Sequence, residues 1–189
     1  MKRSDIEIMA PAGSYESLHA AIDAGANSVY FGVGRLNMRA QSAANFTLED
    51  MGQIVSIARE HGVKSYLTVN TVIYDEEIET LHATIDRACE VGVDAIIAAI
   101  QYARSVGMAV HISTQSNISN IEAVRFFAQW ADVVVLAREL DLVQVARISR
   151  EIERQRITGP GGELVRIEMF AHGALCMAIS GKCYLSLHT

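Results

Sequence analysis

The chain has 189 residues, of which 50% are hydrophobic and 20% charged, a composition typical of a soluble globular domain and unlike that of a disordered chain. No apolar run approaches the roughly 18 residues of a membrane span, and the N-terminus lacks the apolar stretch of a signal peptide. The net charge of −6 gives no basic footprint for nucleic acid. The three cysteines are an odd number that suits reduced thiols, so we expect a cytoplasmic protein.

Short apolar runs alternate with amphipathic stretches along the chain. The runs, which we interpret as strands, cover residues 6–10, 28–31, 64–70, 95–99, 108–113, 133–137 and 165–171. Most stretches between them have the apolar spacing of helices, and Gly25, Gly62 and Gly92 stand where three of these helices are expected to end. Apolar strands that alternate with helices are typical of a parallel sheet covered on both faces.

Polar residues mark the expected helix starts. Ser14 can cap the first helix, and Ser119 with Glu122 has the spacing of a capping box. Cys89 falls on the apolar stripe of its helix, so we interpret it as a small core residue.

Seven β units in this order favour an α/β fold of the TIM-type (β/α) barrel over a doubly wound sheet, since no Gly-rich nucleotide fingerprint follows the first strand. A complete barrel has eight strands. We therefore expect residues 1–189 to form a single, incomplete (β/α)-barrel domain, the N-terminal part of a longer protein, unless the strand count is one short. Pairing with a second copy of the chain would cover open strand edges, so a homo-oligomer is one alternative.

Polar residues gather where the predicted strands end, which is the working face of a barrel. Arg39 and Arg138 carry planar cations that could hold an anionic group. Together with three amide side chains they predict a polar, substrate-binding pocket. The five residues are Asn37, Arg39, Asn70, Gln115 and Arg138.

Two residues near the last predicted strand are candidates for catalysis. Glu168 stands inside the strand, and a carboxylate buried there needs a partner, for which we suggest Arg138. His172 follows the strand and could be a general base, a ligand or a hydrogen-bonded structural residue. His111, inside another strand, faces either the barrel interior or the helices.

Cys176 and Cys183 stand among glycine, serine and lysine, which favours a role as metal ligands or redox partners over a role in the core. In a helix they would share one face but lie about 10 Å apart, too far for a disulfide. Two thiolates alone complete neither a zinc site nor an iron–sulfur cluster. The pairing of Cys176 with His172 that a cysteine protease would need is not indicated by the sequence, and no H-E-x-x-H or G-x-S-x-G motif occurs.

The segment Glu168-x-Phe-x-His-Gly-Ala-Leu-Cys176-Met-Ala-x-Ser-Gly-x-Cys183-x-Leu-Ser186 resembles the signature of peptidase family U32, the collagenase-like proteases. The resemblance extends over essentially the whole chain. It includes Met9-Ala-Pro-Ala-Gly13, Gly25-Ala-x-x-Val-Tyr-Phe-Gly32, Asn70, Ser113-x-Gln115 and Val-Leu-Ala-Arg138-Glu-Leu140.

The resemblance implies chemistry other than proteolysis for several members. These take part in oxygen-independent or prephenate-dependent hydroxylation of a tRNA uridine, an rRNA cytidine or a ubiquinone precursor, and the best understood hold a 4Fe–4S cluster through four cysteines. Cys176 and Cys183 match two of that set, and the resemblance implies that the other two lie beyond Thr189. No intact cluster is therefore expected in this chain by itself.

Three functions follow as alternatives. The first is the N-terminal barrel portion of an iron–sulfur protein that hydroxylates tRNA or rRNA, with prephenate as a candidate co-substrate and RNA bound through the full-length protein. The second is a U32-type peptidase, and the third is a non-catalytic binding module. None of the three involves a membrane.

Overall fold

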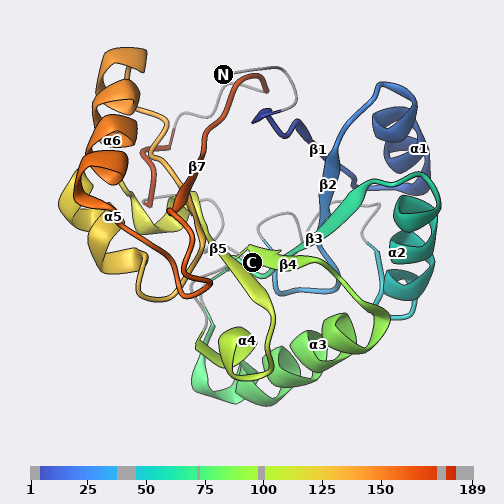
Figure 1. The fold of residues 1–189 in the computed structure, drawn as a ribbon. Helices are drawn as coiled ribbons and strands as arrows, with labels where there is room; N and C mark the ends of the chain where they lie inside the picture. The colour runs from blue at the N-terminus through green and yellow to red at the C-terminus, as the bar shows by residue number, and fades with distance from the viewer. Residues whose placement is uncertain (1–4, 38–45, 72, 98–100, 174–177, 182–189) are drawn as a thin grey trace. The chain divides into compact units, whose positions relative to one another are not determined.

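The structure, a computed structural model, describes residues 5–37, 46–71, 73–97, 101–173 and 178–181. The chain divides into two compact units, Met1–Ile97 and Ala98–Thr189. Each unit contains parallel strands that pair in chain order and are connected through helices (Figure 1).

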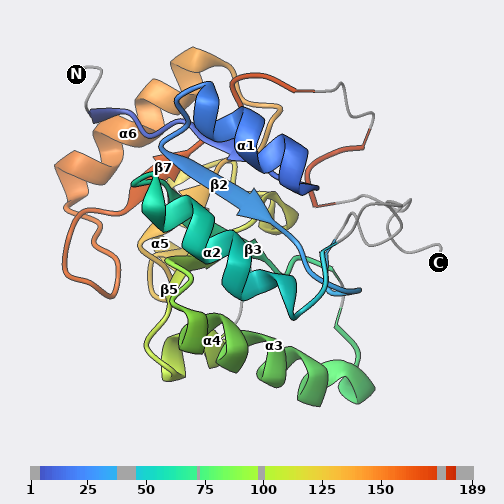
Figure 2. The same cartoon turned by 90° about the vertical axis from the view of Figure 1, so that its right-hand side faces the viewer.

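The first unit holds the strands β1 (Met9–Pro11), β2 (Ser28–Phe31), β3 (Lys64–Thr68) and β4 (Ala95–Ile97), all parallel. The connecting helices are α1 (Tyr15–Asp23), α2 (Asp50–Glu60), the 3-10 helix η2 (Asp75–Glu77) and α3 (Ile78–Val91). Figures 1 and 2 show α1 and α2 next to each other on the same side of β2 and β3. In this position, the apolar stripes of α1 and α2 can cover one face of the sheet.

Burial along the strands shows which face of the first sheet is the core. Val29, Phe31 and Leu67 lie on one face and are almost completely buried, and each such side chain contributes about 1.5–3 kcal/mol through removal from water. Tyr30 and Thr68 alternate with them on the other face and are only half-buried. One face is therefore apolar, and the other carries polar groups.

A polar network ties the segment before β1 to β3. The Glu7 carboxylate accepts hydrogen bonds from Lys64 Nζ, at 2.7 Å, and from the Tyr66 hydroxyl. Burial by itself raises the pKa of Glu7, but the hydrogen bonds from Lys64 and Tyr66 outweigh it and lower the pKa below its ordinary value.

The second unit holds β5 (Ala109–Ile112), β6 (Val133–Val135) and β7 (Arg166–Glu168), again parallel and in chain order. Its helices are α4 (Gln101–Ser105), the 3-10 helix η3 (Thr114–Ser116), α5 (Ile121–Phe127) and α6 (Leu142–Gln155). Val110, Ile112 and Val134 form the buried apolar face of these strands. The alternating positions on the opposite face include His111 and Glu168, so the polar face of this unit carries ionisable groups.

Two outer strands are shorter than predicted. The predicted strand 165–171 ends at Glu168, because its described neighbour β6 offers only three residues for pairing. Met169 and Phe170 are then 43% and 54% exposed. At the other end of the chain, β1 begins at Met9, and Ile6 and Ile8 are exposed.

Two local predictions are wrong. Cys89 is exposed rather than part of the core, because the buried stripe of α3 runs through Leu81, Ile85 and Ala88 and leaves position 89 on the solvent side. Helix α5 is capped by Asn120, whose side chain accepts from the Ala123 amide at 2.9 Å, and not by Ser119.

No helix within the described ranges combines the length and the apolar character that a membrane crossing requires.

Candidate functional site

His111 and Glu168 form a pair on the polar face of the second unit. His111 is in register with Val133, and Glu168 with Val135, so the two ionisable residues lie on the same face from strands on either side of β6. His111 Nδ1 lies 3.2 Å from Glu168 Oε2. The His111 side chain is 6% exposed and that of Glu168 is 25% exposed, so the carboxylate is the more accessible member.

The chemistry of the two groups fixes the direction of this hydrogen bond. An ionised carboxylate can only accept a hydrogen bond. Nδ1 of His111 therefore carries a hydrogen atom and donates the hydrogen bond to Glu168. The buried imidazole thereby holds the carboxylate in place.

The partner that we suggested for Glu168 is wrong. The carboxylate pairs with His111, and the Arg138 guanidinium instead donates a hydrogen bond to the Ala178 carbonyl oxygen at 2.7 Å. His111 and Glu168 are 57 residues apart, so no local spacing connects them. Their positions inside strands were the only signal, and that signal does not say which face each side chain takes.

Residues 178–181 are held by the loop that follows β6. Besides its bond to Ala178, Arg138 donates its backbone N–H to Ser180 Oγ at 3.2 Å. The Ser180 amide donates to Glu139 Oε1 at 2.8 Å, and this hydrogen bond lowers the pKa of Glu139. Ser180 is 2% exposed, so its hydroxyl is enclosed by these contacts.

The same segment lies against the loop that follows β5. Gly181 has a φ of +79°, and a Cβ atom there would lie 2.8 Å from the Gln115 carbonyl oxygen and 3.2 Å from Asn117 Cβ. The structure thus brings two predicted site residues, Gln115 and Arg138, to one segment of the chain. In the structure, these two residues contact residues 178–181 of the chain itself.

The other predicted site residues are distributed differently. Asn37 is buried, and its side-chain amide donates to the Val33 and Gly34 carbonyl oxygens of its own loop. Asn70 follows β3 and is half-buried, and His172 is exposed after β7. Three predicted site residues, namely Arg39, Cys176 and Cys183, lie outside the described residues.

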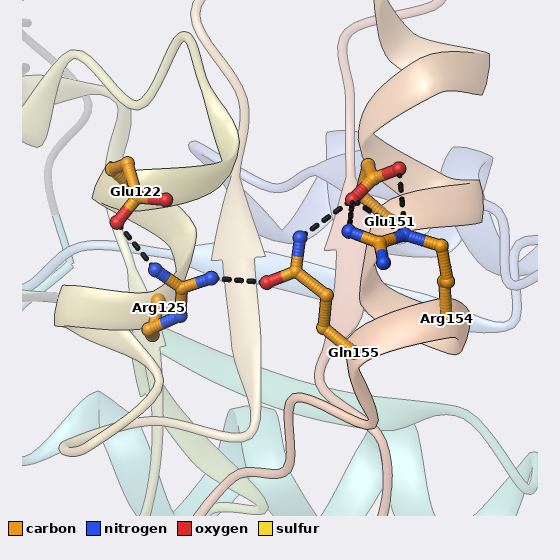
Figure 3. A network of polar contacts seen from close by, with 5 residues as sticks. All are labelled: Glu122, Arg125, Glu151, Arg154 and Gln155. Carbon is orange, nitrogen blue, oxygen red and sulfur yellow. Dashed lines mark hydrogen bonds and ion pairs between the residues drawn. The ribbon is translucent and has the colours of Figure 1, made fainter.

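A second polar network connects α5 with α6 and is shown in Figure 3. Arg125 contacts Glu122 and Gln155, and Gln155 in turn contacts Glu151, which also pairs with Arg154. The hydrogen bonds from Arg154 and Gln155 lower the pKa of Glu151 to about 2. Most of these side chains are exposed, so this network lies on a solvated helix face and forms no enclosed site.

Among the described residues, no group of three or more His, Cys, Asp or Glu side chains could hold a metal ion.

Solved structures define the class of fold. The U32 peptidase Mk0906 aligns over 90% of this chain and 70% of its own, with a TM-score of 0.68 at 17% identity. The deoxyribose phosphate aldolase of Aeropyrum pernix aligns over 80% of this chain and 70% of its own, with a TM-score of 0.55 at 14% identity. The chain is thus an α/β protein of the incomplete (β/α)-barrel type, as predicted, and the described residues hold seven of its parallel strands.

The chain belongs to peptidase family U32, whose model matches residues 13–189. It is 63% identical over 192 residues to a protein of Porphyromonas gingivalis named collagenase, and the alignment covers 100% of this chain and 46% of that protein. It is 34% identical over 189 residues to tRNA hydroxylation protein P1 of Bacillus subtilis, and the alignment covers 96% of this chain and 42% of that protein. The chain thus spans less than half the length of these curated relatives.

Proposed function

We propose that this chain is the N-terminal portion of a collagenase-like peptidase of family U32 and that Glu168 acts as its general base. The observation that carries the proposal is the pairing of Glu168 with His111 at 3.2 Å on the polar strand face. The 63% identity to the Porphyromonas gingivalis collagenase over the whole chain supports the choice of peptide as substrate.

The roles of Glu168 and His111 follow from the exposure of their side chains and from the direction of the hydrogen bond between them. Glu168, the more exposed member, accepts a proton from a water molecule as the water oxygen bonds to the carbonyl carbon of the peptide. The carboxylic acid then returns this proton to the amine nitrogen as the C–N bond breaks, so the carboxylate is regenerated. His111 is a positioning residue because it keeps one carboxylate oxygen hydrogen-bonded throughout.

The experiment compares gelatin and peptide cleavage by the full-length protein with and without Glu168→Gln. Loss of a general base reduces turnover by about 10²–10⁴-fold. Glu153→Gln, an exposed change on α6, is the matched control and should leave the rate unchanged. If the Glu168→Gln enzyme cleaves at the normal rate, Glu168 is not the base.

A second candidate is RNA hydroxylation, which is favoured by the 34% identity to tRNA hydroxylation protein P1. In this case Cys176 and Cys183 would supply two of the four thiolates of a 4Fe–4S cluster, which provides one-electron chemistry when bound, and prephenate would be a co-substrate. The remaining thiolates would come from the rest of the full-length protein. Either candidate function would use the predicted substrate-binding residues, which are Asn37, Arg39, Asn70, Gln115 and Arg138.

Two measurements separate the candidates. Mass spectrometry of tRNA and rRNA nucleosides from cells with and without the gene would reveal a missing hydroxylated nucleoside if the second candidate holds. If every modified nucleoside persists, RNA hydroxylation fails as a function. Peptide cleavage that is abolished by Glu168→Gln would favour the peptidase.

The cluster has its own test. The anaerobically purified full-length protein should absorb broadly near about 400 nm, as thiolate-ligated iron does, whereas the 189-residue chain should be colourless. A brown 189-residue chain would contradict the proposed division of the ligands.

A further inference from the structure

Two exposed apolar side chains follow the proposed base directly. Met169 and Phe170 come one and two residues after Glu168, the last residue of β7, and are 43% and 54% exposed. Two residues of chain span at most about 7 Å, so the backbone of Phe170 stays close to that of Glu168. Large apolar side chains that gather in water beside a reactive carboxylate mark a binding surface.

A third exposed apolar residue, Ile179, is presented by a backbone that is fixed on both sides of it. The Ala178 carbonyl oxygen accepts from the Arg138 guanidinium, and the Ser180 amide donates to Glu139. The Ile179 side chain nevertheless remains 57% exposed. A side chain held in this way loses little backbone freedom when a ligand packs against it.

The loop after β6 brings these residues to the same edge of the second unit. The Leu136 amide donates to the Glu168 carbonyl oxygen at 2.9 Å, and the Arg138 amide, two residues further on, donates to Ser180 Oγ at 3.2 Å. The two attachment points are therefore separated by at most about 7 Å of loop. A few residues of extended peptide, at about 3.3 Å each, cover a comparable length.

The chemistry of this edge favours a neutral, apolar ligand group. Arg138 and Glu139 carry opposite charges, and each binds a backbone group of residues 178–181, so together they add no net charge. Met169, Phe170 and Ile179 offer a flexible thioether, an aromatic ring and a branched aliphatic chain. Such a surface suits an aliphatic or aromatic side chain better than a charged one.

We propose that Met169, Phe170 and Ile179 form an apolar subsite that binds a large apolar side chain of a peptide substrate beside Glu168. The inference rests on the proposed peptidase function and adds a substrate class, namely polypeptide segments that contain leucine, isoleucine or phenylalanine. We assign the substrate as the occupant because Glu168 can act as a base only if this edge stays open to the peptide. A permanent cover from elsewhere in the protein would block it.

The test measures binding, so it requires no turnover. Short fluorescein-labelled peptides of glycine, serine and alanine, each with one leucine at a successive position, are titrated into the full-length protein and followed by fluorescence anisotropy. The best leucine peptide should bind about tenfold more tightly than the same peptide with alanine, as expected for a few methylene groups in an apolar pocket. In Phe170→Ser and in Ile179→Ser this ratio should fall below about threefold, whereas Phe170→Leu, which keeps an apolar side chain, should retain most of it.

Phe126→Ser is the matched control, because Phe126 is 56% exposed on α5 of the same unit. It should leave the ratio unchanged. Equal binding of the leucine and alanine peptides, an unchanged ratio in both serine variants, or an equal loss in Phe126→Ser would overturn the subsite. So would a Phe170→Ser protein that is less stable in urea but keeps the ratio, since another part of the full-length protein would then cover Phe170.

Cleavage of the same peptides is measured separately, which distinguishes failure of the subsite from failure of the peptidase proposal. If the leucine peptide binds preferentially but is not cleaved, the subsite stands and the peptidase proposal fails. If the peptides are cleaved in a Glu168-dependent manner and with equal kcat/KM, the base stands and the subsite fails.

Discussion

Gly181 packs so closely against Gln115 that a Cβ atom would lie 2.8 Å from the Gln115 carbonyl oxygen. Its φ of +79° adds a second restriction, because side chains rarely adopt this backbone conformation. No larger residue fits this position without moving the backbone of one of the two segments.

Gly181→Ala should therefore lower the free energy of unfolding. Backbone strain alone costs about 1–2 kcal/mol, and the close contact adds to it. Urea denaturation measures the loss. Gly173→Ala is the matched control, since nothing lies within contact of a Cβ there and its φ is not positive, and it should change stability by less than about 0.5 kcal/mol. Equal effects of the two changes would show that the contact with Gln115 is unimportant.

The His111–Glu168 pair should show energetic coupling. A double-mutant cycle with His111→Phe and Glu168→Gln should give an interaction energy of about 0.5–3 kcal/mol in urea denaturation, because the residues are in contact. The same cycle between His111 and the exposed Glu163 should give a value near zero. A coupling near zero for His111 and Glu168 would contradict the hydrogen bond.

The N-cap of α5 gives a prediction that distinguishes two neighbouring residues, Asn120 and Ser119. Asn120→Ala should destabilise the protein by about 1 kcal/mol, because it removes the side-chain acceptor for the Ala123 amide. Ser119→Ala should have almost no effect, although the sequence pattern favours Ser119 as the cap. Thermal unfolding of the two variants decides between them, and the reverse order would show that the cap lies one residue earlier.

The network of Glu7 with Lys64 and Tyr66 makes stability depend on pH. Because the folded state lowers the pKa of Glu7 from its ordinary value of 4.5, the network's contribution is complete above pH 4.5 and is lost as the pH falls through the lower folded value. Stability measured from pH 6 down to acidic pH should decline less steeply in Glu7→Gln, which cannot ionise. Identical pH profiles for the two proteins would exclude this contribution.

The sequence by itself determined the order of strands and helices, since each depends on local patterns. Ser28–Phe31 was predicted with its observed bounds, and Ser14 caps α1 as expected, because a run of apolar residues and a cap both act over a few neighbours. The cysteine spacing and the motifs around it also identified the family without any structure.

Only the tertiary structure decided which distant groups meet. The choice of His111 over Arg138 as the partner of Glu168 depends on which face each strand residue takes and on the register of three strands, neither of which a local pattern encodes. The exposure of Cys89 likewise depends on where the neighbouring elements cover α3. Burial and contact are properties of the packed chain, so the His111–Glu168 pair and the contact of Arg138 with Ala178 depend on folding, which brings residues 40 or more positions apart together.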